Sequence, residues 1–119
     1  MTALERALDG LRQALEGPRN HHIWRWLVRH RMAGVKEALE AEQHHGGDAW
    51  LAAREESLQR DRDNLLRRLT ELGPLVLDSA DVEPVRRELR RLLTDLEHHR
   101  QRLNDLVYDT VSLELGGSE

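Results

Sequence analysis

A histidine and a glutamate lie where the helical pattern of this sequence otherwise places leucine, and they are the first candidates for chemistry. His99 falls on the apolar stripe of a heptad pattern at 82–113, and Glu55 falls on the leucine stripe at 49–72. If these two segments are neighbouring antiparallel helices, Glu55 lies level with His99. A buried histidine that faces a carboxylate predicts either a hydrogen-bonded pair that fixes helix register or half of a metal site. Arg62, one heptad after Glu55, favours the pair, because a carboxylate beside a guanidinium needs no further cation.

Adjacent histidines occur three times, and two of these doublets are preceded by carboxylates at helical spacing. Carboxylate-bridged di-iron bundles use Glu-x-x-His on two helices. The chain carries Glu-x-x-His at Glu42 and His45, and Asp-x-x-His at Asp95 and His98. Antiparallel pairing leaves these two motifs about two turns apart, which favours a surface zinc or nickel site over a di-iron site. The candidate ligands for a divalent metal, iron or zinc, are His99, Glu55, His45, Glu42 and His98.

Another histidine, His30, lies in a short motif. The run His30-Arg31-Met32-Ala33-Gly34 resembles the His-x-Leu-Lys-Gly signature of histidine-phosphotransfer domains, which are small helical bundles with a phosphorylated surface histidine. The apolar residue at the third position and the glycine at the fifth match, whereas Ala33 replaces the lysine. The resemblance covers five residues and implies His30 as a phosphorylation site. The alternative is an exposed histidine, with Gly34 admitting a close helix contact.

Two tryptophans lie two positions apart and therefore cannot face the same core. On a helix Trp24 and Trp26 point about 200° apart. Trp24 shares its face with apolar neighbours, whereas Trp26 lies amid Arg25 and Arg29. Trp26 either covers arginine stems at the surface or anchors an intermolecular contact, since Trp and Arg dominate binding hot spots. The predicted partner-binding residues are Trp26, Arg25 and Arg29, with Leu106 and Tyr108 on the last helix.

Helices are the elements that must position these residues. The predicted helices are 3–16, 21–44, 49–72 and 82–113, separated by Gly17-Pro18, Gly46-Gly47 and the link at 73–81, with a flexible tail at 116–119. Short links make neighbours antiparallel. The sequence predicts one all-α domain, 1–119, with three long antiparallel helices and a short N-terminal fourth helix. Because that fourth helix is short, one end of the bundle is expected to hold four helices and the other three.

Composition bounds the function further. The chain has 119 residues, a formal net charge of −4, no cysteine, and one lysine against seventeen arginines, which is typical of a bacterial GC-rich genome. The net charge argues against a nucleic-acid binder, and the absence of cysteine excludes disulfides and thiolate metal sites. No apolar run approaches the roughly 20 residues that cross a bilayer, and the N-terminus does not follow a signal-peptide pattern, so we expect a cytoplasmic protein.

These observations favour an interaction module over an enzyme. The end of the bundle near Gly73-Pro74 carries an excess of arginine, which is either chance on solvated faces or a surface for an acidic protein partner. Tyr108 and Leu106 lie where the bundle is expected to be thinner, which predicts a homodimer. The leading hypothesis is a small non-enzymatic helical module that self-associates and needs no cofactor. The alternatives are a metal-binding bundle and a phosphotransfer domain.

Overall fold

Four helices make up the part of the chain that the structure describes. The computed structural model describes residues 1–18, 21–42 and 49–116 of the chain. The helices are α1 (Ala3–Glu16), α2 (His21–Glu40), α3 (Ala49–Asp78) and α4 (Glu83–Gly116), and the described residues contain no strand. The all-α prediction is therefore confirmed. The predicted tail lies mostly at 117–119, outside the described residues.

Helix α1 begins and ends where local sequence signals place its limits. The Thr2 side chain accepts a hydrogen bond from the backbone N–H of Glu5, and the Glu5 carboxylate accepts one from the backbone N–H of Thr2. This capping box satisfies two backbone donors that the first helical turn leaves free. Gly17, in an extended conformation, ends the helix.

The helices form a closed ring in which each contacts two neighbours. Helix α1 packs on α2 and α4, and α3 packs on α2 and α4. Each helix turns one stripe of leucine, valine or alanine toward the centre of this ring, where Leu11, Val28, Val35, Leu89 and Leu96 are fully buried. The arrangement follows from the 3.6-residue period of the apolar positions, because only one side of each helix can be removed from water.

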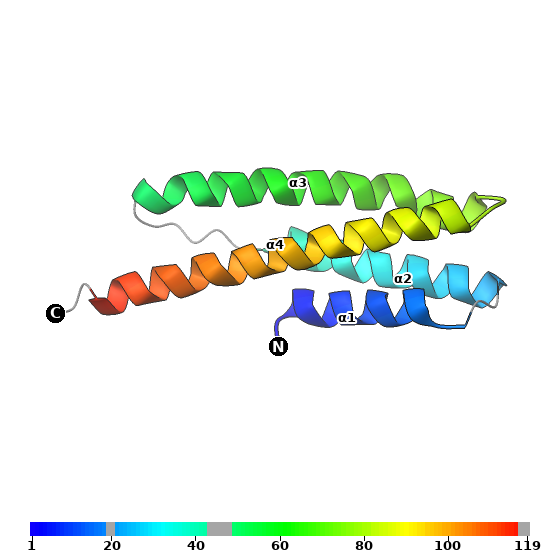
Figure 1. Ribbon diagram of the computed structural model, residues 1–119, viewed down its shortest axis with the longest axis horizontal. Helices are drawn as coiled ribbons and strands as arrows, with labels where there is room; N and C mark the ends of the chain where they lie inside the picture. The colour runs from blue at the N-terminus through cyan, green and yellow to red at the C-terminus, as the bar shows by residue number, and fades with distance from the viewer. Residues whose placement is uncertain (19–20, 43–48, 117–119) are drawn as a thin grey trace.

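The molecule is a rod whose two ends differ. It measures 60 × 23 × 19 Å, and α3 and α4 continue well past the ends of α1 and α2 (Figure 1). We call α3 before Asp61 and α4 after Arg102 the arm. Within the part of the chain that the structure describes, the arm holds two helices. The prediction of a three-helix end was wrong there, because α2 ends at Glu40 while α3 runs for another three turns beyond that level.

Helix α3 runs through Pro74, although the Gly73-Pro74 pair predicts that it ends there. A proline inside a helix costs about 3 kcal/mol because it removes a hydrogen bond and crowds the preceding turn. Beyond it, Val76 is fully buried on the stripe of Leu69, which stabilises the added turn by about 1.5–3 kcal/mol. The Arg25 guanidinium also caps the helix, donating to the carbonyls of residues 76, 77 and 79 at 3.4, 3.1 and 2.7 Å.

Gly73 leaves room for an arginine of α2 on the surface of α3. A Cβ atom at residue 73 would lie 2.9 Å from Cζ of Arg29, whose side chain lies across the glycine.

No helix in the described ranges is long and apolar enough to span a membrane.

Candidate functional site

The most polar place in the interior is the level at which α2 ends and the arm begins. His99 of α4 is completely buried. Its Nδ1 atom lies 2.8 Å from Oδ2 of Asp61 on α3, and its Nε2 atom lies 2.9 and 3.1 Å from the two carboxylate oxygens of Glu42, two residues beyond α2. Arg102 donates to the same Asp61 oxygen at 2.5 Å. One imidazole thus joins three segments of the chain.

The two carboxylates determine the protonation of this histidine. Burial of the imidazole lowers the pKa of His99, but the hydrogen bonds and charges of Glu42 and Asp61 together outweigh burial and raise that pKa. A neutral imidazole has one N–H and can donate to one carboxylate, whereas the imidazolium donates to both. The geometry therefore suits a positively charged His99 held between two negative groups.

The prediction that Glu55 is the partner of His99 was wrong. His99 bonds Asp61 and Glu42 rather than Glu55, whose buried Oε1 atom has no hydrogen-bond partner among the described residues. The reason is the extra length of α3, which ends at Asp78 instead of residue 72 and shifts its pairing with α4 by about two turns. This shift also brings Arg54 to Asp109, at 2.6 Å.

The residues of the predicted metal site separate into different places. Glu42 and His99 meet, while His98 is exposed and Glu55 lies away from them. His45 lies outside the described residues. Among the residues that the structure describes, no group of three or more His, Asp or Glu side chains is arranged to hold a metal ion.

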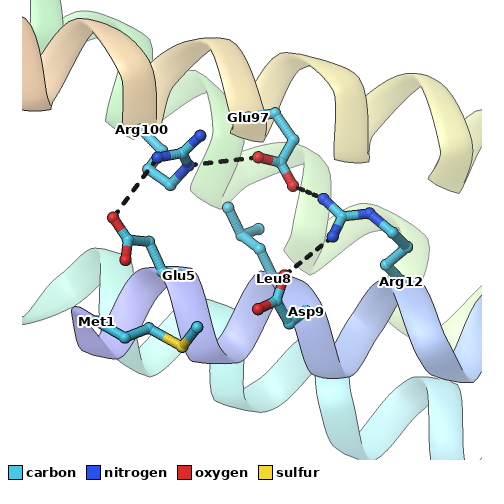
Figure 2. A pocket seen from close by; sticks show the side chains of 7 residues that line it. All are labelled: Met1, Glu5, Leu8, Asp9, Arg12, Glu97 and Arg100. Atoms are coloured by element: carbon cyan, nitrogen blue, oxygen red, sulfur yellow. Dashed lines mark hydrogen bonds and ion pairs between the residues drawn. The ribbon is translucent and has the colours of Figure 1, made fainter.

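A shallow pocket lies between α1 and α4 and is lined by alternating charges (Figure 2). Arg100 reaches Glu5 at 3.5 Å and Glu97 at 3.3 Å, and Arg12 pairs with Glu97 and, at 2.9 Å, with Asp9. The five side chains form one continuous series of ion pairs from the start of α1 to its third turn. Each charge already has a protein partner, so the arrangement clamps α1 to α4 and leaves no cation or carboxylate of the series aimed at a ligand.

Glu5 serves two structural roles in this pocket. The hydrogen bond from the backbone N–H of Thr2 lowers the pKa of Glu5, and Asn104 and Arg100 lower it further. The same carboxylate therefore caps α1 and ties its first turn to α4.

The outer face of α2 is the third candidate, and it differs from the other two in being apolar and open. Ile23 is 65% exposed and Trp26 is 62% exposed. The Trp26 ring stacks on the ring of His30, with centroids 5.2 Å apart and planes 5° from parallel. We call Ile23, Trp26, His30, Ala33, Gly34 and Glu37 the outer face of α2. His30 is exposed there beside an aromatic ring rather than beside the lysine of the phosphotransfer motif.

The other predicted partner-binding residues fall into different surroundings. Arg25 and Arg29 turn toward α3, where the first caps the helix end and the second covers Gly73. Leu106 is buried in the arm, only 2% exposed, whereas Tyr108 is 73% exposed. The arginine-rich start of α4 is partly neutralised by its own glutamates, as in the pair of Arg91 and Glu88 at 3.1 Å.

Sequence reasoning missed Asp61 and Arg102. A signal for Asp61 was present, because it lies between Leu58 and Leu65 at steps of three and four, on the stripe that faces the core. Arg102 carried no such signal, since its contact depends on the register of α3 against α4.

Comparisons of the chain with protein families, with curated proteins and with solved structures find no match.

Proposed function

We propose that this protein is a small cytoplasmic, non-enzymatic interaction module and that the outer face of α2 is its binding surface. The observation that carries the proposal is the exposure of Ile23 and Trp26 side by side on that face, 65% and 62%. Single exposed leucines are common on proteins, but an exposed tryptophan beside an exposed isoleucine leaves a large apolar area in water.

The energetics support a binding role for these side chains. Burying a tryptophan removes about 150–250 Å² from water, and residues of this type dominate the free energy of protein association. The stack of Trp26 on His30 holds the indole in place before binding, which lowers the entropy lost on association. The side chains around His99 bond one another, and so do the charged side chains between α1 and α4. Both groups therefore suit structural roles.

Photo-crosslinking in cells tests the proposal. With p-benzoylphenylalanine in place of Ile23, we expect a crosslinked product that is lost when Trp26→Ala is added. The same crosslinker in place of Arg87, an exposed residue of α4, is the matched control and should give no such product. Equal products at both positions, or none at residue 23, would count against a binding surface on α2.

A further inference from the structure

We infer that the partner of the outer face of α2 is a second copy of this chain, with two α2 helices packed antiparallel about a two-fold axis near His30. The inference rests on the proposed function and names its partner. An antiparallel pair brings Ile23 of one copy level with Glu37 of the other. It also brings Trp26 level with the small residues Ala33 and Gly34.

Side-chain size is complementary in this arrangement. The N-terminal half of the outer face carries the large side chains Ile23 and Trp26, and the C-terminal half carries Ala33 and Gly34. Among the residues that the structure describes, a Cβ atom added at Gly34 would meet nothing within 4 Å, so no contact between these residues explains a glycine in this helix. A helical glycine costs stability relative to alanine. In the proposed dimer, the indole of Trp26 from the second copy packs against Gly34, where a larger side chain would exclude it.

Charge on the outer face distinguishes the two orientations. Glu37 is the acidic residue of that face, whereas Arg25 and Arg29 turn toward α3 and Arg31 lies against Gly10 of α1. Parallel pairing would set Glu37 against Glu37 and leave both tryptophans on the same level, whereas antiparallel pairing separates both pairs.

Another exposed apolar group, on the arm, lacks this self-complementarity. Tyr108 and Val111 are 73% and 47% exposed, but neighbouring charged residues 105 and 109 are both aspartates. Two copies that met through this face would bring like charges together. Asp109 is also engaged already, by Arg54 at 2.6 Å.

Cysteine crosslinking tests the orientation directly, because the chain has no cysteine of its own. Proteins carrying Ile23→Cys and Glu37→Cys are mixed and oxidised by air. Disulfides need Cα atoms within about 7 Å, so antiparallel pairing predicts links between residue 23 of one copy and residue 37 of the other. Links of 23 to 23 and of 37 to 37 in place of the mixed product would overturn the inference.

A substitution at Gly34 tests the seat for the indole. A Cβ atom at residue 34 meets nothing within 4 Å in the described part of the chain, so we expect Gly34→Leu to leave the midpoint of thermal unfolding of the monomer unchanged or to raise it. We expect its dimer dissociation constant, measured by sedimentation, to rise at least tenfold. Thr94→Leu, on the exposed side of α4, is the control and should leave that constant unchanged. Equal weakening by both variants would contradict the inference.

The two proposals fail in different ways. A wild-type protein that stays monomeric at high micromolar concentration overturns self-pairing. If the crosslinker at residue 23 nevertheless yields a product that contains a different protein, the binding surface stands with another partner. If it yields none, the binding surface falls as well.

Discussion

The two sides of α2 belong to the same helix but lie in different surroundings. On the inner side, Trp24 is 3% exposed and Val28 is 0% exposed. On the outer side, Ile23 is 65% exposed and Trp26 is 62% exposed. A helix that only needed to fold would place polar side chains on its outer side. From this contrast we predict that substitutions only two positions apart affect either the stability of the protein or its proposed binding, but not both.

The largest expected effect on stability comes from a substitution on the inner side of α2. Trp24→Ala should lower the free energy of unfolding by about 3–5 kcal/mol, because it empties a core aromatic site. Chemical denaturation monitored by circular dichroism measures this change. Trp24→Phe is the control and should cost much less, since within the described ranges the indole Nε1 atom has no hydrogen-bond partner to lose. Equal stability of Trp24→Ala and the wild type would show that the inner side is assigned to the wrong face.

The next effect lies where the inner side of α2 ends. Glu42 continues the stripe of Val35 and Leu39 and meets His99. His99→Leu leaves Glu42 and Asp61 without their shared partner. Removing one member of a buried ion pair costs about 3–5 kcal/mol, and we expect about 1–3 kcal/mol here because Asp61 remains 28% exposed. Denaturant midpoints give the value, and a more stable variant would contradict the bridging role of His99.

The same cluster predicts a dependence of stability on pH. The pKa of His99 is raised in the folded protein, so its contribution to the free energy of unfolding is fully present below its ordinary value of 6.5. That contribution is lost as the pH rises through the folded-state pKa. Wild-type stability should therefore fall between neutral and mildly alkaline pH, and His99→Leu should show a flatter profile. A profile that is unchanged in the variant would assign the effect to other groups.

A smaller effect, a gain in stability, is expected from a substitution on the outer side of α2. Gly34→Ala should stabilise the monomer by about 0.5–1 kcal/mol, because the helical glycine has excess freedom in the unfolded chain and a Cβ atom meets nothing within 4 Å. Thermal unfolding at low protein concentration measures the gain. Gly73→Ala is the matched control and should give less, since Arg29 lies 2.9 Å from the added Cβ atom.

The sequence predicted what local signals decide and failed where tertiary packing decides. The limits of α1 follow from the capping box of Thr2 and Glu5 and from Gly17, which all act within a few residues. Pro74 carried an equally clear local signal for a helix end. It was overridden because Val76 is buried on α3 and Arg25 caps the helix from α2, two interactions that no local pattern contains.

That one override changed the predicted site. The longer α3 shifts the pairing with α4 by about two turns, so the core histidine was found and its partner was not. The separation of Trp24 from Trp26 needed only the helical period, and the exposures of 3% and 62% agree with it. Sequence reasoning thus locates faces more securely than it locates contacts between elements.

Sedimentation of the wild type and of Trp26→Ala tests the central claim most directly. We predict a wild-type dimer that dissociates on dilution and a Trp26→Ala protein that stays monomeric at high micromolar concentration. The unfolding free energy of the variant monomer should stay within about 0.5 kcal/mol of the wild-type monomer, as is usual for exposed positions. A Trp26→Ala protein that associates as the wild type does, or that unfolds, would contradict the assignment of this face to binding.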